Sequence, residues 1–293
     1  LLSWRYRDPA ALVATRVGAS PRQTMYTPAG GNMPQSLVNR TALDIQDGRL
    51  DVALVAGAEA WRTRMALRAR GERPDWTVQD DDVQPTDWYG SDAPMANPAE
   101  TARGIFMPVH HYPMFESAVR SAAGRRVEEH QAHLGRLWAG FSQVAAANPN
   151  AWIDRSYTAE EIRTPRPDNR MIGFPYPKLM NSNNNVEQSA ALVLCSVERA
   201  RALGVPPDRW VFPLAGADAR DTPFVSHRPA LAASPAMRLA GAAALDLAGV
   251  GVDDLGHVDL YSCFPSAVQV AAAELGLGLD RPLTVTGGMS FAR

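Results

Sequence analysis

A pair of glycines, Gly30 and Gly31, opens an amphipathic helical stretch over residues 36–46, and this arrangement constrains the chain more than any other feature. Two glycines at the start of a helix leave backbone N–H groups free at its positive end, which suits an anion. We therefore expect the N–H groups of Gly31 and Asn32 to stabilise an oxyanion. The alternative is a tight connection that binds no ligand, with Asn32 as the N-cap of the helix.

Two strand candidates flank this helix. Residues 24–27 form the first, and residues 52–58 are small and apolar at every position, which is typical of a strand buried on both faces of a parallel sheet. Helical spacing places Val38, Ala42 and Ile45 on one packed face of the helix between them. The order of strand, helix and strand predicts a βαβ-type unit and an α/β fold.

This segment closely resembles the thiolase family, acyl-CoA acyltransferases that carry a nucleophilic cysteine at the start of the helix. In that family the cysteine is followed by Gly, Ser and Gly and by the helix, then by Gly, Asp and a strand ending in Ala-Gly-Gly-x-Glu-Ser. Here Asp47-Gly48 follows the helix, and residues 56–60 read Ala-Gly-Ala-Glu-Ala. Counting back from Gly48 places the family's cysteine position on Gly31. A glycine cannot attack a thioester, so the nucleophile is missing at this position.

The resemblance continues over nearly the whole chain. Residues 192–204 follow the family's segment Ala-Ala-Leu-Leu-Met-Ser-Glu and the helix after it, which closes on a glycine. A later strand and helix repeat the βαβ order, as a duplicated fold predicts. The further elements that we expect are strands over 190–195, 210–215 and 257–260 and helices over 8–16, 197–204, 235–248 and 265–275.

The resemblance implies the thiolase fold, an α/β fold of two similar halves, each with a mixed five-stranded sheet, and a loop domain over the active site. Residues 62–178 are rich in Arg, Asp, Pro and Trp and are expected to form this inserted loop domain, with one long helix over 112–144. The N-terminal half is then 1–61 with 179–224, and the C-terminal half is 225–293. We expect the turn at Gly30 to face a pocket under the insertion.

The end of the chain matches the opening of another thiolase motif. Gly287-Gly288 corresponds to a glycine pair that the family follows, after four residues, with Gly-His-Pro. The resemblance assigns both glycines to the substrate site. Arg293 falls on the third glycine, so the histidine that activates the nucleophile would be the next residue. Since the chain also starts at Leu1 without an initiator methionine, we expect it to be an internal piece of a longer protein.

Tyr261 and Cys263 lie in Tyr-Ser-Cys-Phe, between a strand candidate and a helix. Thiolases have Asn-Glu-Ala-Phe here, or His-Asp-Cys-Phe in the sterol-carrier branch, and the first residue holds a water of an oxyanion hole. Tyr261 replaces that residue, and its hydroxyl can donate to an oxyanion or act as an acid. The alternative is that both side chains pack at the end of the sheet, which we favour for Cys263.

Two histidine pairs remain. His110-His111 lies at the start of the long helix, where thiolases place a histidine or aromatic residue against the acyl pocket, so the resemblance implies a substrate-binding role. The alternative is a capping or surface pair. His130 and His133 lie one helical turn apart, a spacing that suits a metal, but no third ligand is evident and we favour a solvated helix face.

Composition narrows the function classes. A net charge of −2 without long basic runs argues against a nucleic-acid surface and against a polybasic membrane patch. No stretch reaches the uninterrupted apolar length that a membrane span needs. Cys195 and Cys263 lie in segments with the character of buried structure and have no metal-ligand spacing, so we expect no disulfide, no metal site and a cytoplasmic location.

Three functions follow from the resemblance. The first is an acyl-CoA acyltransferase of the acetyl-CoA acetyltransferase family in lipid or sterol metabolism, with a coenzyme A thioester as substrate and no tightly bound cofactor. The second is a cysteine-less acyl-CoA aldolase that uses Tyr261 for retro-aldol cleavage and works with an OB-fold partner. The third is a non-catalytic subunit that binds CoA esters. The resemblance also implies a homodimer and one shared pocket, in which Tyr261 reaches the backbone of Gly31.

Overall fold

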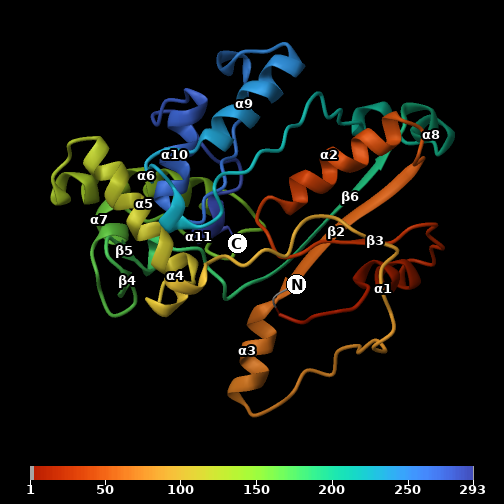
Figure 1. Cartoon of the computed structure of the whole chain (residues 1–293), viewed down its shortest axis with the longest axis horizontal. Helices are drawn as coiled ribbons and strands as arrows, with labels where there is room; N and C mark the ends of the chain where they lie inside the picture. Colours follow the sequence, from red (N-terminus) through yellow and green to blue (C-terminus); the bar gives the residue numbers. More distant parts are fainter. Residues whose placement is uncertain (1–2, 293) are drawn as a thin grey trace. The chain divides into compact units, whose positions relative to one another are not determined.

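The computed structural model describes residues 3–292, which form two compact units (Figure 1). Unit 1 comprises Leu1–Ala93 and Asn184–Pro213, and unit 2 comprises Pro94–Asn183 and Leu214–Arg293. These units divide the chain differently from the three domains expected above, and that three-domain division stays a prediction.

Unit 1 is built around an antiparallel pair of long strands, β2 and β6, which lie side by side in Figure 1. The ladder runs from Val52 opposite Cys195 to Ala60 opposite Glu187. A second pair, β1 and β3, is short and parallel. The elements of unit 1 are α1 (Pro9–Arg16), β1 (Met25–Tyr26), α2 (Met33–Gln46), β2 (Val52–Ala60), α3 (Trp61–Ala69), β3 (Asp87–Trp88), β6 (Glu187–Cys195), α8 (Val197–Ala202) and η2 (Pro207–Arg209).

The prediction that residues 52–58 are buried on both faces of a parallel sheet is wrong. Strand β2 pairs antiparallel with β6 alone, and most of its side chains are exposed or partly buried. Three two-stranded sheets are formed within residues 3–292, in place of the expected five-stranded sheets. The physical reason for this exposure is the small size of the sheet. In a ladder of two strands each strand has one unpaired edge, so β2 is not enclosed as a central strand of a parallel sheet would be.

Helix α2 begins three residues earlier than expected and buries a different face. Its buried residues, Met33, Ser36, Thr41 and Asp44, follow helical spacing, whereas the predicted face of Val38, Ala42 and Ile45 is only partly buried. The Asp44 carboxylate accepts hydrogen bonds of 2.8 Å from the Nε atoms of Arg40 and Arg49. A buried carboxylate is tolerated here because it is paired.

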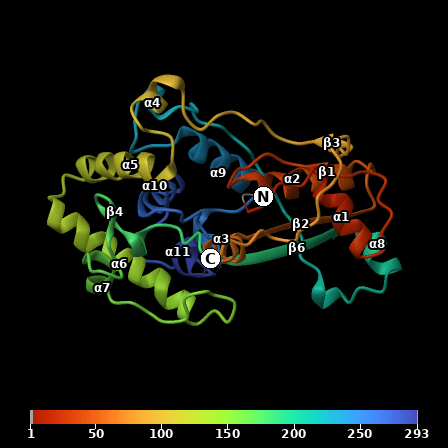
Figure 2. The same ribbon diagram turned by 90° about the horizontal axis from the view of Figure 1, so that it is seen from below.

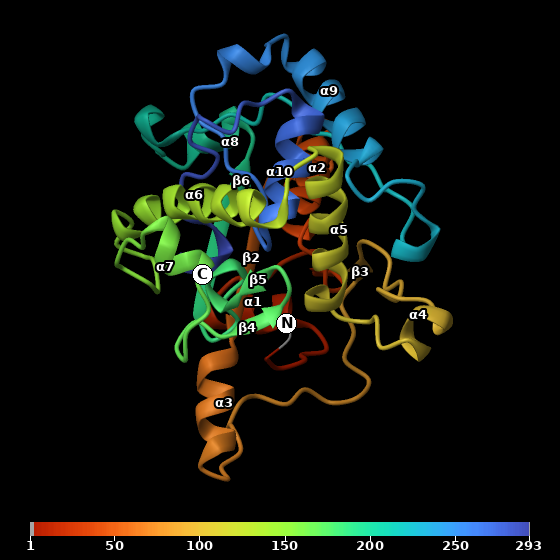
Figure 3. The same ribbon diagram turned by 90° about the vertical axis from the view of Figure 1, so that its left-hand side faces the viewer.

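Helix α3 occupies residues for which a loop was predicted. It starts directly where β2 ends and extends from that end of the strand (Figure 3). Its sequence Trp-Arg-Thr-Arg-Met-Ala-Leu-Arg-Ala is rich in good helix formers, and none of its residues is buried. The arginines that suggested a loop therefore form a solvated helix.

Unit 2 is mainly helical, with α10 packed between α5 and α9 (Figure 2). Its core contains aromatic side chains from several helices, including Trp138, Phe141, Phe264 and Phe291. The elements of unit 2 are α4 (Pro98–Ala102), α5 (Pro108–Ala122), α6 (Val127–Ala146), α7 (Ala159–Arg163), β4 (Met171–Gly173), β5 (Tyr176–Pro177), η1 (Lys178–Met180), η3 (Val225–His227), α9 (Pro235–Ala248), η4 (Val252–Asp254), α10 (Pro265–Leu275) and α11 (Gly288–Phe291).

The long helix predicted over 112–144 is two helices, α5 and α6. Gly124 separates them with a φ of 62°, a left-handed conformation that ends a helix and that glycine adopts without steric cost. Each helix thereby points its own face into the core of unit 2.

The two later helices agree with prediction, but the strands next to them do not. Helices α9 and α10 span Pro235–Ala248 and Pro265–Leu275, as expected. Among the residues described, 210–215 and 257–260 form no strand. Residues 257–260 are held by one backbone hydrogen bond of 3.0 Å, from the Leu260 N–H to the Leu283 carbonyl. In the part of the chain described, no helix is long and apolar enough to cross a membrane.

Candidate active site

A cavity of about 310 Å³ lies in unit 2, where α5, α9 and α10 meet the segment 221–234. It brings together His111 and Tyr261, two residues that the sequence singled out independently. Figure 3 shows these three helices, which supply seven of its fifteen lining residues. The other lining residues are Met95, Tyr112, Phe115, Asp221, Pro223, Val225, Arg228, Ala233, Ser234, Met237, Ser266, Ala267 and Val270.

Two tyrosine hydroxyls at the cavity converge on one thiol. The side chains of Tyr112 and Tyr261 both make hydrogen bonds to Cys263, which is itself buried behind them and does not line the cavity. Tyr112 is fixed by stacking on Phe264, with ring centroids 4.4 Å apart. The structure therefore confirms that Cys263 is buried, and it places Tyr261 at the cavity wall.

Burial controls the acidity of this cluster. Removal from water raises the pKa of the Cys263 thiol to about 11, although hydrogen bonds from both tyrosines act in the opposite direction. Burial also raises the pKa of the Tyr112 phenol, and the neighbouring Cys263 adds to this shift. At neutral pH Cys263 and Tyr112 carry their protons, so the cluster can donate hydrogen bonds but offers no thiolate.

One ring nitrogen of His111 is buried without a partner. The side chain is buried, and Nε2 makes no hydrogen bond to the described protein atoms. The backbone carbonyl of Ile105 interacts with the ring and favours its protonated form. In the tautomer that carries its proton on Nδ1, Nε2 has a lone pair.

The pKa of His111 lies below its ordinary value. Burial is the main cause, because it disfavours the charged imidazolium, and the neighbouring His110 and Arg228 act in the same direction. Glu100 opposes them. The Glu100 carboxylate is held by backbone N–H groups, that of Ser226 at 2.7 Å and that of Asn97 at 2.8 Å.

His110 has a different position from its neighbour. Its Nδ1 accepts a hydrogen bond of 3.3 Å from the Met107 N–H at the start of α5, and it does not line the cavity. His110 therefore matches the alternative of a capping histidine. Of the two histidines, only His111 lies where it could bind a substrate.

Asp221 and Arg228, which the sequence analysis did not single out, form a pair at the cavity. The closest nitrogen–oxygen distance is 3.5 Å, and Asp221 also accepts the Ala236 N–H of α9 at 3.0 Å. The Arg228 guanidinium lies over the Phe115 ring, 5.4 Å from its centroid. Both charged side chains therefore have partners in the cavity wall, and these contacts hold the segment 221–228 against α5 and α9.

The expectation that His130 and His133 lie on a solvated helix face is wrong. His130 is fully buried, and its Nε2 lies 2.6 Å from Oε1 of Glu116 on α5. The Tyr176 hydroxyl donates to the other oxygen of Glu116 at 2.7 Å, and the Gln269 amide donates to Oε1 at 2.8 Å. Within residues 3–292 no group of three or more His, Cys, Asp and Glu side chains is placed to hold a metal ion.

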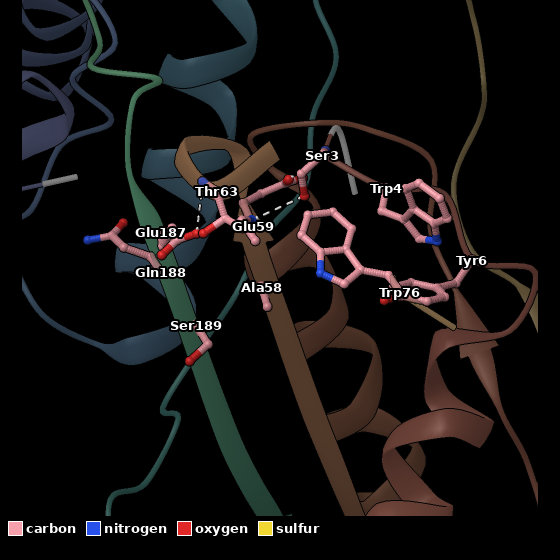
Figure 4. A pocket seen from close by; sticks show the side chains of 11 residues that line it. Ser3, Trp4, Tyr6, Ala58, Glu59, Thr63, Trp76, Glu187, Gln188 and Ser189 are labelled. Atoms are coloured by element: carbon pink, nitrogen blue, oxygen red, sulfur yellow. Dashed lines mark hydrogen bonds between the residues drawn. The ribbon is translucent and has the colours of Figure 1, made fainter. Parts of the chain in front are cut away.

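A second cavity, of about 510 Å³, lies in unit 1 on the β2–β6 ladder (Figure 4). Trp4 and Trp76 meet edge to face on one side of it, with ring centroids 5.5 Å apart. On the other side, the Glu59 and Glu187 carboxylates accept the backbone N–H groups of Ser3 and Thr63. Because both carboxylates are tied to backbone and no predicted site residue lies here, we place the candidate active site in unit 2.

Known structures resemble this chain over most of its length. A monomeric SCP2-thiolase-like protein type 1 from Mycobacterium smegmatis matches 96% of the chain with 33% sequence identity and a TM-score of 0.80. The chain belongs to the thiolase superfamily. It spans 55% of the length of that relative.

Two further structures share the fold of this thiolase-superfamily chain. An Ltp2–ChsH2(DUF35) aldolase matches 90% of the chain and 66% of its own length, with 21% identity and a TM-score of 0.64. The dimeric peroxisomal thiolase of Saccharomyces cerevisiae matches 88% and 63%, with 14% identity and a TM-score of 0.51. No protein-family model and no curated protein matches the sequence.

In this thiolase-like chain the turn at Gly30, Gly31 and Asn32 is exposed and lines neither of the two cavities. Asn32 occupies the N-cap position of α2, but its side chain makes no capping bond and lies 3.4 Å from the Ser36 hydroxyl instead. The pocket expected at this turn, and the approach of Tyr261 to Gly31, join residues of different units and stay predictions.

Gly287 and Gly288 are packed inside unit 2. Their φ angles are 102° and 74°, and a Cβ on Gly288 would lie 2.6 Å from both Phe141 Cδ1 and Ser262 Oγ. The Gly287 N–H donates to the Thr284 hydroxyl at 3.0 Å. Packing and turn geometry account for both glycines, and a contribution to the substrate site stays a prediction.

Tyr112, Arg228 and Ser266 are cavity residues that the sequence analysis missed. Of these three, only Tyr112 could have been found from the sequence, because it directly follows His111 near the start of the same helix. Arg228 lies in an irregular segment between motifs, and Ser266 is the second residue of α10, so neither belongs to a pattern that sequence spacing reveals.

Proposed function

We propose that this thiolase-like chain acts on coenzyme A thioesters by acid–base chemistry, as an acyl-CoA aldolase that cleaves a carbon–carbon bond without a covalent acyl-enzyme. The observation that carries the proposal is the convergence of the Tyr112 and Tyr261 hydroxyls on a protonated thiol at the cavity wall. Proton donors at a cavity suit a reaction in which negative charge develops on a substrate oxygen.

The reaction needs no nucleophile. In a retro-aldol cleavage the hydroxyl proton of a 3-hydroxyacyl thioester leaves, the hydroxyl carbon becomes a carbonyl, and the bond between Cα and Cβ breaks. The electron pair of that bond forms the enolate of the shorter thioester, which then takes a proton at Cα. Tyr261 is the group we assign to donate to the developing thioester oxyanion.

Acyl transfer is the second candidate, with Cys263 as the nucleophile. Its thiol lies beside two cavity residues, which favours it, but with a pKa of about 11 only about one thiol in 10⁴ is ionised at pH 7. Gly31, the position that the family's cysteine would occupy, has no reactive atom. Acyl transfer in lipid or sterol metabolism is therefore the weaker proposal, and a non-catalytic CoA-ester-binding subunit is the remaining one.

The proposal also covers the partners with which this chain assembles. One structural neighbour is named Ltp2-ChsH2(DUF35) aldolase, a name that supports a protein partner for this chain, although the likeness at 21% identity shows the fold alone. The partner that we propose has an OB-fold. A homodimer is also proposed; the similar proteins include one named as monomeric and one named as dimeric. The substrate is a coenzyme A thioester, and we propose no tightly bound cofactor.

The test is to express the complete reading frame and to assay it for both reactions with matched thioesters. A 3-hydroxyacyl-CoA should yield a carbonyl product and a shorter acyl-CoA, without free CoA as a co-substrate. A 3-oxoacyl-CoA with added CoA tests thiolysis. Thiolysis together with a thioester adduct on Cys263, found by mass spectrometry, would establish acyl transfer instead. Binding of both thioesters without turnover would establish the non-catalytic subunit.

A further inference from the structure

His111 is the cavity residue whose reactive nitrogen is left without a partner. Three buried side-chain atoms of residues 3–292 lack a hydrogen-bond partner, and Nε2 of His111 is the one whose residue lines this cavity. A buried polar atom without a partner costs free energy, so it marks a position that a ligand group or a water completes. We propose that His111 Nε2 is the proton acceptor of this cavity and takes the proton of a hydroxyl group on the bound ligand.

The Ile105 carbonyl interacts with the His111 ring and acts to raise the pKa of the imidazole, against the larger effect of burial. This carbonyl belongs to a backbone segment that is itself fixed, since the Ile105 N–H donates to the Glu100 carbonyl at 2.9 Å. A ring whose Nδ1 carries the proton presents a lone pair at Nε2. We assign this tautomer to the resting ring, because Nε2 is the ring nitrogen that is buried without a partner.

The charges around the ring suit a base that takes a proton and returns it. From α4, the Glu100 carboxylate favours the imidazolium that forms on proton capture; from α5 and the segment 221–228, His110 and Arg228 disfavour it. Burial, the largest influence, keeps the resting ring neutral. Tyr261 and Asp221 also line the cavity.

The other groups in this cavity that could act as a base already have hydrogen-bond or ion-pair partners. Asp221 accepts the Ala236 N–H and pairs with Arg228. The Tyr112 phenol hydrogen-bonds to Cys263 and burial raises its pKa, while Tyr261 is assigned as the donor to the substrate oxyanion. Nε2 of His111 is thus left as the basic atom without a partner.

This inference rests on the proposed function and adds its proton acceptor. Nε2 takes the hydroxyl proton of a 3-hydroxyacyl thioester as the carbonyl forms and the bond between Cα and Cβ breaks. The enolate of the shorter thioester then takes a proton at Cα. The imidazolium of His111 supplies this proton and so returns to its neutral form. No oxidant, reductant or external nucleophile is consumed.

The first test does not depend on activity. Nitrogen-15 NMR of histidine-labelled protein, with His111 assigned through H111N, should show a protonated Nδ1 and a bare Nε2 at pH 7, and a titration midpoint below 6.5. Addition of 3-hydroxybutyryl-CoA should shift the Nε2 resonance, whereas butyryl-CoA, which lacks the hydroxyl, should not. A protonated Nε2 at pH 7, or identical Nε2 resonances with the two thioesters, overturns the proposal.

The second test uses variants of the complete protein. Asparagine in H111N keeps a polar side chain but removes the basic Nε2, so kcat/KM for aldol cleavage should fall by about 10²- to 10⁴-fold. H257N, at an exposed histidine outside the cavity lining, is the matched control and should leave it unchanged. Added imidazole should restore turnover in H111A, more at higher pH because the neutral form is the base.

The two proposals fail in different ways. If H111N keeps the wild-type rate and pH profile, the role of His111 is overturned while aldol cleavage stands. If the complete protein cleaves no 3-hydroxyacyl-CoA, the proposed function fails, and the NMR comparison of the two thioesters alone decides whether Nε2 accepts the ligand hydroxyl.

Discussion

Nε2 of His130 and Oε1 of Glu116 lie 2.6 Å apart in the interior of unit 2, and neither side chain is more than 2% exposed. The same carboxylate accepts hydrogen bonds from the Tyr176 hydroxyl and the Gln269 amide, so three donors surround it. An ionised carboxylate is tolerated in a protein interior only with such partners. The network ties α5, α6, β5 and α10 together, and through Tyr176 it reaches Ser266 at the cavity wall, 2.9 Å away.

Glu116→Ala should therefore destabilise the protein severely. The change leaves three buried donors without an acceptor, and breaking a buried pair of this kind costs about 3–5 kcal/mol. Glu116→Gln keeps the shape and one acceptor oxygen and should cost less. Denaturant unfolding followed by circular dichroism measures both, and a double-mutant cycle with His130→Ala isolates the pair. A loss below about 1 kcal/mol for Glu116→Ala would contradict the network's contribution to stability.

Helices were predictable because their signals are local. Pro265 opens α10, and Gly276, with a φ of 70°, closes it; Ser234 caps α9, and Gly249 ends it with a φ of 67°. Each of these residues acts on backbone within one turn, so sequence spacing alone fixes the ends. Thiolase-superfamily membership was likewise readable from the glycine and strand pattern around Gly31.

Strands and the candidate site depend on partners that are distant in the chain. Residues 257–260 have strand-like composition, yet one backbone hydrogen bond to Leu283 does not make a ladder. His130 was assigned to a solvated face because its partner, Glu116, lies on another helix. Nε2 of His111 is distinctive only through burial and a missing partner, which spacing does not encode.

Gly288→Ala should destabilise unit 2 more than a glycine replacement at an open turn. A Cβ at this position would lie 2.6 Å from Phe141 and Ser262, at a backbone φ of 74° that disfavours every residue with a Cβ. Overpacking costs about 1–3 kcal/mol in addition to the backbone cost of about 1–2 kcal/mol. Gly124→Ala is the matched control, because its φ is 62° and nothing lies within 4 Å of the added Cβ. Equal losses in unfolding experiments would show that packing at Gly288 contributes nothing.

Cys263 should resist thiol reagents at neutral pH, and Cys195 should react first. Burial raises the pKa of the Cys263 thiol to about 11 and also shields it, whereas Cys195 is partly exposed. Because the thiolate is the reactive form, labelling of Cys263 should rise as pH increases towards 11. Peptide mapping after iodoacetamide treatment at pH 7 and pH 9.5 measures this. Rapid labelling of Cys263 at pH 7 in the folded protein would restore it as a candidate nucleophile.

Tyr261→Phe should leave the fold intact and remove a proton donor from the cavity. Tyr261 is 48% exposed, so loss of its hydroxyl costs little packing, while Cys263 loses one of the donors that lower its thiol pKa. If the hydroxyl donates to the substrate oxyanion, turnover of an acyl-CoA should fall by about 10²-fold or more, with a smaller change in KM. Tyr112→Phe is the comparison, since it removes the other phenol that bonds to Cys263. Unchanged turnover in Tyr261→Phe, with an unchanged unfolding midpoint, would reduce this tyrosine to a packing residue and leave the approach of its hydroxyl to Gly31 without a function.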